Sequence, residues 1–233
     1  LTSFGDYFRY VTEMDETGHE LSQMVTAIST NVTYFFREQD HFVFLKERVL
    51  PEIARKKGKD GTKRIRCWSA GCSTGEEPYS IAITMHDFFL NHQGWDIKIL
   101  ATDVSTRVLD VGRKGVYKIG ALENVPSHLS KKSFYRGYGK NDGYIMVKEH
   151  LKKMVTIGHI NLMYERFPFK GPFDFIFCRN VMIYFDKPTQ KELLSKFHRH
   201  LGDGGHLFLG HSEGLTGTHS GFKYVAPAVY VKQ

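Results

Sequence analysis

The sequence predicts an α/β fold: a mostly parallel, doubly wound (Rossmann-like) sheet, with an N-terminal helical segment and a small antiparallel β-subdomain. Three observations support this prediction. Short apolar segments typical of buried strands alternate with longer segments whose apolar residues recur every three or four positions. A glycine-rich turn joins one such strand directly to a helix. Polar residues follow several predicted strands, where sheets of this kind bind ligands.

The N-terminal segment, residues 1–57, is predicted to be helical. Its second half carries an apolar face with helical spacing, formed by Phe42, Phe44, Leu45, Val49 and Ile53. Asn31 and Thr33 are helix-capping types and Arg37 would suit an exposed helix surface, so structural roles alone could explain these residues. A polar linker leads into the main domain, residues 58–233. The chain begins without methionine or a signal-like segment, and we expect it to be part of a longer protein.

The most informative stretch, residues 64–83, contains a strand, a glycine turn and the start of a helix. Gly71 and Gly75 interrupt the apolar pattern, and such glycines let a ligand approach the backbone. Glu76 and Glu77 follow in the first helical turn, where a phosphate-binding loop would carry no carboxylate. This helix start therefore favours a cationic or hydroxyl-rich ligand.

A second predicted strand, residues 96–104, ends in Asp103. An acid at this position binds ribose hydroxyls in nucleoside-binding α/β folds. Asp103 could instead cap the short helix that follows, as could Ser105. A sulfonium nucleoside would satisfy both the acidic turn and Asp103.

Later strands end in further polar residues. Strands are expected over residues 154–162 and 172–180, which bring Asn161, Arg179 and Asn180 to the same edge of the sheet. A helix begins at Pro188, and the segments 204–210 and 224–231 are expected to close the sheet.

An inserted β-subdomain is predicted at about residues 133–150, with a hairpin over 134–147. Its turn carries Gly137, Gly139 and Gly143. This spacing is one residue too long for the dinucleotide-binding fingerprint, and no helix follows, so we reject that match.

Composition limits the partners. The formal net charge of +7 at pH 7 favours an acidic partner, although a solvated basic surface has the same composition. Cys67, Cys72 and Cys178 show no metal spacing and no even disulfide set, which favours buried thiols in a reducing cytoplasm. The 12 histidines show no paired spacing on one face, so we assign no metal site. No apolar run reaches the length of a membrane span.

Four segments resemble the CheR family, the S-adenosylmethionine-dependent methyltransferases that esterify glutamates on bacterial chemoreceptors during chemotactic adaptation. They are Thr30–Arg37, Trp68–Tyr79, Ala101–Val104 and Phe177–Asp186, of which the second and fourth are highly specific. The resemblance runs from about Ile28 to the C-terminus. It implies a methyltransferase sheet, S-adenosylmethionine as cofactor and S-adenosylhomocysteine as product. Residues 1–57 would be the remnant of the family's helical subdomain plus a connecting helix.

The resemblance also implies site residues and partners. Cofactor contacts are implied for Asn31, Thr33, Arg37, Glu76, Asp103, Asn161, Leu162, Arg179 and Asn180. Arg37 and Tyr184 would lie nearest the transferred methyl group. The implied partner is the cytoplasmic helical bundle of chemoreceptors, approached on an acidic face. In some family members the β-subdomain adds the receptor's C-terminal tail as a strand, which here would dock near the three-glycine turn. Nucleic acid is not an expected partner.

Three other functions compete. A serine hydrolase is suggested by the nucleophile-elbow pattern Gly71–Gly75, with Asp174 or Asp186 and His206 or His211 as possible triad partners. The elbow normally follows several strands, and a hydrolase leaves Asp103 unexplained. A nucleic-acid methyltransferase would suit the charge, but the adjacent prolines usual for amino-group methylation are missing. A non-catalytic protein that senses the cofactor and docks on receptors remains open.

Overall fold

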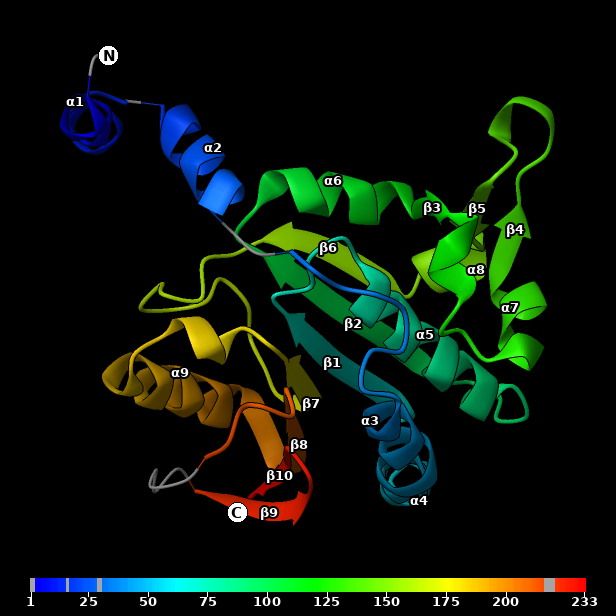
Figure 1. The fold of residues 1–233 in the computed structure, drawn as a ribbon. Helices are drawn as coiled ribbons and strands as arrows, with labels where there is room; N and C mark the ends of the chain where they lie inside the picture. The colour runs from blue at the N-terminus through cyan, green and yellow to red at the C-terminus, as the bar shows by residue number, and fades with distance from the viewer. Residues whose placement is uncertain (1–2, 16, 29–30, 216–220) are drawn as a thin grey trace.

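The computed structural model describes residues 3–15, 17–28, 31–215 and 221–233 (Figure 1). Its central sheet has seven strands in the order β6-β2-β1-β7-β8-β10-β9. The first five in this order run parallel, and β10 is antiparallel to both of its neighbours. The strands are β1 (Arg64–Ala70), β2 (Asp96–Asp103), β6 (Val155–His159), β7 (Phe173–Cys178), β8 (Leu201–Leu209), β9 (Phe222–Ala226) and β10 (Val229–Lys232). The predicted mostly parallel, doubly wound sheet is confirmed.

Alternating strand residues build two apolar layers, one on each face of the sheet. One layer contains Ile65, Cys67, Phe175, Phe177 and Phe208. The other contains Trp68, Ala70, Ile176, Cys178, Leu207 and Leu209. Because successive side chains of a strand point to opposite faces, both layers draw on the same strands. The near-continuous apolar runs in the sequence reflect this double burial.

Helices cover both faces. The helices are α1 (Phe4–Arg9), α2 (His19–Ile28), α3 (Gln39–Phe44), α4 (Leu50–Lys59), α5 (Glu76–Phe89), α6 (Thr106–Lys114), α7 (Ser127–Ser133), α8 (Glu149–Lys152) and α9 (Lys187–His200). The first apolar layer packs against α3, α4 and α5, and the second packs against α9. None of the helices in the described ranges combines the length and apolar composition of a membrane span.

The helical run from α3 to α4 contains a π-helical turn over Leu45–Val49. Proline has no N–H to donate to the carbonyl of the residue four positions earlier, and its ring crowds that carbonyl. Pro51 is the second residue of α4, and at the junction the N–H of Leu50 bonds the carbonyl of Leu45, five residues back. The run widens at this point but continues, as predicted from its apolar spacing.

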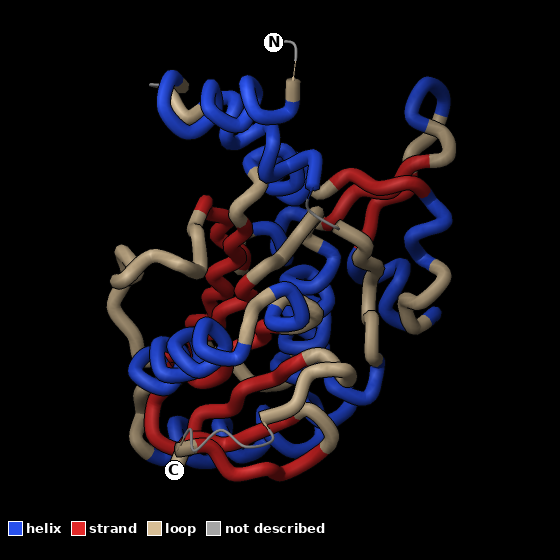
Figure 2. Tube along the Cα trace, turned by 60° about the vertical axis from the view of Figure 1, so that its left-hand side comes forward, coloured by secondary structure: helices blue, strands red, loops and turns tan. Residues whose placement is uncertain are grey.

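A second, three-stranded antiparallel sheet has the order β3-β5-β4. It consists of β3 (Val116–Lys118), β4 (Phe134–Arg136) and β5 (Tyr144–Val147). The predicted hairpin is β4 and β5. β3 lies outside the predicted subdomain of about residues 133–150. It was not predicted, because its three residues are too few to give a periodic signal. Figure 2 shows this small sheet beside the central one, with the N-terminal helices and β9–β10 at opposite ends of the molecule.

Two details near the strand ends differ from the prediction. The segment 224–231 is not one strand, since Pro227 and Ala228 form a turn between β9 and β10. Ser105 occupies the position before α6, but its side chain makes no capping hydrogen bond. The Asp103 carboxylate accepts the backbone N–H of Ser105 instead, at 3.0 Å.

Candidate active site

A cavity of about 500 Å³ opens at the carboxyl ends of β1, β2, β6 and β7. Chain order reverses between β1 and β7, and this switch point is where doubly wound sheets bind ligands. All of the predicted site residues except Glu76 line the cavity, namely Asn31, Thr33, Arg37, Asp103, Asn161, Leu162, Arg179, Asn180 and Tyr184. Thr30, the first residue of one resembling segment, lies outside the described residues. Gly71, Ser73 and Glu77 line the cavity as well, so the fold gathers residues from five separate segments into one site.

The turn after β1, residues 71–75, which we call the β1 loop, forms one wall. Gly71 has a φ of +81°, and a Cβ on it would meet Val181 Cγ2 at 2.4 Å. The N–H groups of Gly71 and Cys72 donate to the Thr102 carbonyl at 2.8 and 2.9 Å. The N–H of Ser73 donates to Asp103 at 2.8 Å. The loop is therefore fastened to the end of β2, and it requires glycine at its closest approach to the opposite wall.

Asp103 has two structural bonds and still borders the cavity. Its Oδ2 accepts from Ser73 and its Oδ1 from Ser105. Each carboxylate oxygen has further lone pairs, so these bonds leave acceptor capacity for a ligand hydroxyl. Its alternative role as an anchor for the following helix and its role as a ligand-binding acid are therefore compatible.

Glu76 and Glu77, adjacent at the start of α5, have different surroundings. Glu77 lines the cavity, whereas Glu76 is not among the described residues that do so. Glu76 accepts a hydrogen bond from the Thr74 hydroxyl at 2.6 Å, and burial raises its pKa. Successive helical side chains point about 100° apart, so only one of two neighbours can face a given side. Of these two glutamates, Glu77 is the one at the cavity, and a cofactor contact from Glu76 stays a prediction.

Arg179, almost fully buried at the end of β7, joins three separate segments. Its Nε and Nη2 donate to Glu38 Oε2 at 3.2 and 3.0 Å, and its Nη1 donates to Glu77 at 3.3 Å. Nη2 also donates to the Arg37 carbonyl. Burial raises the pKa of Glu77 even though the guanidinium opposes this. At Glu38 burial also acts to raise the pKa, but the guanidinium, the His211 N–H and His41 together lower it.

Glu213 was not anticipated from the sequence, yet it supports the opposite wall of the cavity. Its buried carboxylate accepts the backbone N–H groups of Asn180, Gly210 and Ile183 at 2.8, 2.6 and 3.2 Å. Asn180 has a φ of +58°, a left-handed conformation that such bonds stabilise. Glu213 follows the end of β8, so a search for acidic residues after predicted strands, which identified Asp103, could have identified Glu213 too. Such a search does not reveal that its partners lie in another loop.

The mouth of the cavity carries Arg37 and Tyr184. Arg37 Nη1 donates to the Val32 carbonyl at 2.8 Å, and its guanidinium lies 5.9 Å from the Tyr34 ring centre. Tyr184 is 59% exposed and belongs to the turn that Glu213 holds. Its exposure leaves the ring free to contact an incoming substrate.

The hydrolase alternative lacks its base. Ser73 has the left-handed φ of +48° that a nucleophile elbow needs, but its hydroxyl donates to the Asn31 carbonyl at 3.2 Å. His211 pairs with Asp40, Asp186 caps α9, and Asp174 pairs with Lys57. Within the described ranges no histidine is bonded to Ser73. The three cysteines are free and buried, and burial raises their pKa values, so none is an activated thiolate.

Fold and cavity together define a nucleoside-binding α/β protein of the methyltransferase kind, and comparison with known proteins gives the family. The model of the CheR methyltransferase SAM binding domain matches residues 31–231. A chemotaxis protein methyltransferase of Borreliella burgdorferi is 43% identical over 100% of this chain and 82% of its own length. Chemotaxis protein methyltransferase 2 of Pseudomonas aeruginosa is 41% identical over 99% of this chain and 80% of its own. The Escherichia coli chemotaxis protein methyltransferase is 38% identical over 99% and 77%.

The chain therefore belongs to the CheR methyltransferase family, and its cofactor is S-adenosylmethionine. Both predictions from the sequence resemblance are confirmed. The hydrolase alternative is not favoured.

Proposed function

We propose that this chain transfers a methyl group from S-adenosylmethionine to glutamate side chains of bacterial chemoreceptors and so forms glutamate methyl esters. The observation that carries the proposal is the cavity at the switch point, which gathers the residues of all four family-like segments. Its volume of about 500 Å³ is within the usual range for small-molecule sites.

The chemistry of the cavity fits this cofactor. S-Adenosylmethionine supplies an electrophilic methyl on a sulfonium and carries a ribose. Asp103 offers free lone pairs to ribose hydroxyls, as the first polar group after β2. Glu77 and Asp103 place two carboxyl groups on the cavity wall, which suits a cation. A direct contact from Glu76 would require its buried carboxylate to turn toward the cavity.

The acceptor carboxylate needs no general base. A glutamate side chain has a reference pKa of about 4.3 and is ionised at neutral pH. The protein's contribution is then to position the two reactants and keep water away. We assign Arg37 to steer the incoming carboxylate, since its guanidinium lies at the cavity mouth. Tyr184 contributes an exposed ring beside the reacting groups.

A receptor tail would dock on the small sheet through the outer edge of β4. β4 bonds β5 on one side and has no other strand neighbour in the described chain. Tyr135, on β4, and Tyr138, just after it, are exposed. The glycines serve the turn itself, because a Cβ on Gly137 would lie 2.0 Å from the Asn141 carbonyl oxygen. Peptide binding by main-chain pairing needs such a free edge.

The test uses S-adenosylmethionine labelled in its methyl group and membranes that contain a bacterial chemoreceptor. We expect label on the receptor that is released as methanol in mild base, and none on a receptor whose modifiable glutamates are replaced by alanine. Base-stable label would assign a different acceptor, and S-adenosylhomocysteine binding without any transfer would favour the non-catalytic alternative.

A further inference from the structure

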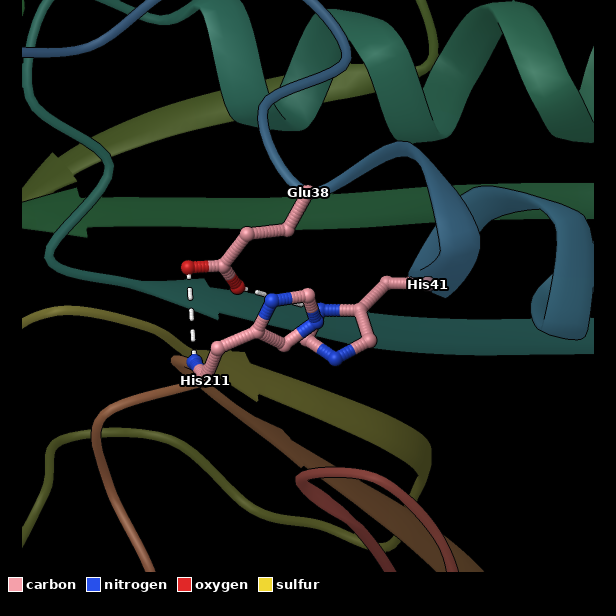
Figure 3. Close-up of side chains that lie close together, drawn as sticks. All are labelled: Glu38, His41 and His211. Carbon is pink, nitrogen blue, oxygen red and sulfur yellow. Dashed lines mark hydrogen bonds and ion pairs between the residues drawn. The ribbon is translucent and has the colours of Figure 1, made fainter.

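Glu38, His41 and His211 form a cluster outside the cavity lining (Figure 3). Glu38 and His41 lie at the start of α3, and His211 follows β8. One potential metal-binding atom from each residue lies within 4.8 Å of the other two. We call these residues the Glu38 cluster. His211 is far from Glu38 and His41 in the sequence, so no motif spacing predicts that the three residues lie together.

His41 presents an uncompensated lone pair to this cluster. The ring is 1% exposed, and its Nε2 lies 3.3 Å from the Pro227 carbonyl. A carbonyl only accepts, so Nε2 carries the hydrogen. With the hydrogen on Nε2, the imidazole has its lone pair on Nδ1. No described protein group donates a hydrogen bond to Nδ1.

That lone pair faces a carboxylate. His41 Nδ1 lies 3.4 Å from Glu38 Oε2. Two acceptors in this arrangement repel each other unless a cation lies between them. Nitrogen and oxygen ligands of tetrahedral zinc, bound at about 2.0–2.1 Å, are about 3.3–3.4 Å apart. The separation of the two atoms is therefore that of a ligand pair.

His211 has the arrangement usual for a metal-binding histidine. Its Nε2 lies 2.9 Å from Asp40 Oδ2, so Nε2 carries a hydrogen and Nδ1 is the nitrogen left to bind an ion. Metal-bound histidines almost always donate their other N–H to a carboxylate or a carbonyl. Here Asp40 does this for His211 and Pro227 does it for His41. The His211 side chain is 45% exposed, which gives an ion an entry path and gives the ring freedom to close on it.

The local charge also favours a cation. Arg179 already binds Glu38 and would repel a second positive charge. The surrounding carboxylates outnumber it, and they belong to Glu38, Asp40, Glu77 and Glu213. An ion with two positive charges would therefore balance an acidic region within a basic protein.

From these contacts we propose that Glu38, His41 and His211 bind a divalent transition-metal ion, with zinc as the best fit and water completing the coordination. Two imidazoles with one carboxylate are a known zinc ligand set. The ion would tie the start of α3 to the loop after β8, which also carries Glu213. It would therefore stabilise the folded chain without entering the cavity.

The test is calorimetric titration of zinc chloride into untagged, chelator-treated protein. We expect one zinc per chain and a higher melting temperature with zinc, since the ion binds only the folded state. His211→Gln should weaken zinc binding at least about tenfold. His150→Gln is the matched control, because the His86 and His150 ring centres also lie 4.5 Å apart but form no three-ligand group within the described residues. That variant should bind zinc as the wild type does.

No zinc binding by the wild type, or equal binding by His211→Gln, would overturn the proposal. S-Adenosylhomocysteine titration of each variant checks that it is folded. Cobalt chloride gives a second readout, since a four-coordinate site absorbs strongly in the visible range. A weak octahedral spectrum would indicate surface adsorption only and would also contradict the site.

Discussion

The two loops that face each other across the cavity are held in opposite ways. The β1 loop is fastened locally, by backbone N–H groups that donate to Thr102 and Asp103 at the end of the neighbouring strand. The loop after β7, residues 179–184, is held by side chains from far along the chain. Glu38, Glu77 and Glu213 each bond one or more of its groups.

This difference separates two tasks. Glycines and a strand-end acid shape the β1 loop for close contact with a nucleoside. Buried carboxylates hold the loop after β7 in a left-handed turn and so position Tyr184 at the mouth. We therefore expect changes at the β1 loop to weaken cofactor binding, and changes behind the loop after β7 to reduce stability and turnover.

The largest expected effect comes from Glu213→Ala. It leaves three backbone N–H groups without their charged acceptor and should lower the free energy of unfolding by about 3–5 kcal/mol. Methyl transfer should fall with it. Urea unfolding measures the loss, with Asp110→Ala as control, because the Asp110 side chain is 65% exposed and that of its ion-pair partner Arg113 is 48% exposed. A loss below about 1 kcal/mol would show that Glu213 does not hold the loop.

His41 should make the stability of the folded chain sensitive to acid. Burial lowers its pKa to about 4 in the folded chain, against an ordinary value of 6.5. The unfolded chain therefore binds the proton first as the pH falls. Stability that is fully present above pH 6.5 is lost down to about pH 4, by about 3 kcal/mol.

The comparison that checks this is unfolding free energy against pH for the wild type and His41→Asn, both in chelator. The wild-type curve should fall more steeply between these pH values. Parallel curves would mean that His41 does not titrate differently in the folded and unfolded chains.

A smaller effect is expected where the small sheet contacts the β1 loop. The Tyr117 hydroxyl, on β3, donates to the Thr74 carbonyl at 2.8 Å. Tyr117→Phe should cost about 1 kcal/mol of stability and weaken S-adenosylhomocysteine binding a few-fold. Tyr79→Phe is the matched control, because its hydroxyl donates to the Gly112 carbonyl, outside the loop. It should cost similar stability but leave affinity unchanged, and equal affinity losses would argue against a specific anchor.

The sequence predicted the parts of this molecule whose signals are local. Buried strands, the glycine turn and Asp103 all lie in short segments with periodic or strand-end patterns, and the fold has them as expected. β3 was not predicted because it is short. The roles of Glu213 and the Glu38 cluster were not predicted, because only the fold brings these residues and their partners together. Which of Glu76 and Glu77 faces the cavity depends on the rotation of α5 about its axis, and two adjacent glutamates in the sequence do not reveal that rotation.

The most direct test of the account is calorimetric titration of S-adenosylhomocysteine into the wild type, Asp103→Asn, Asp103→Ala and Tyr184→Phe. We expect one-to-one binding by the wild type, at least about tenfold weaker binding by both Asp103 variants, and little change in Tyr184→Phe, which should lose turnover instead. Asp103→Asn retains an acceptor for a backbone amide, so it separates ligand binding from loop anchoring. Equal affinity in the wild type and both Asp103 variants would contradict the assignment of the β1 loop and Asp103 as the nucleoside site.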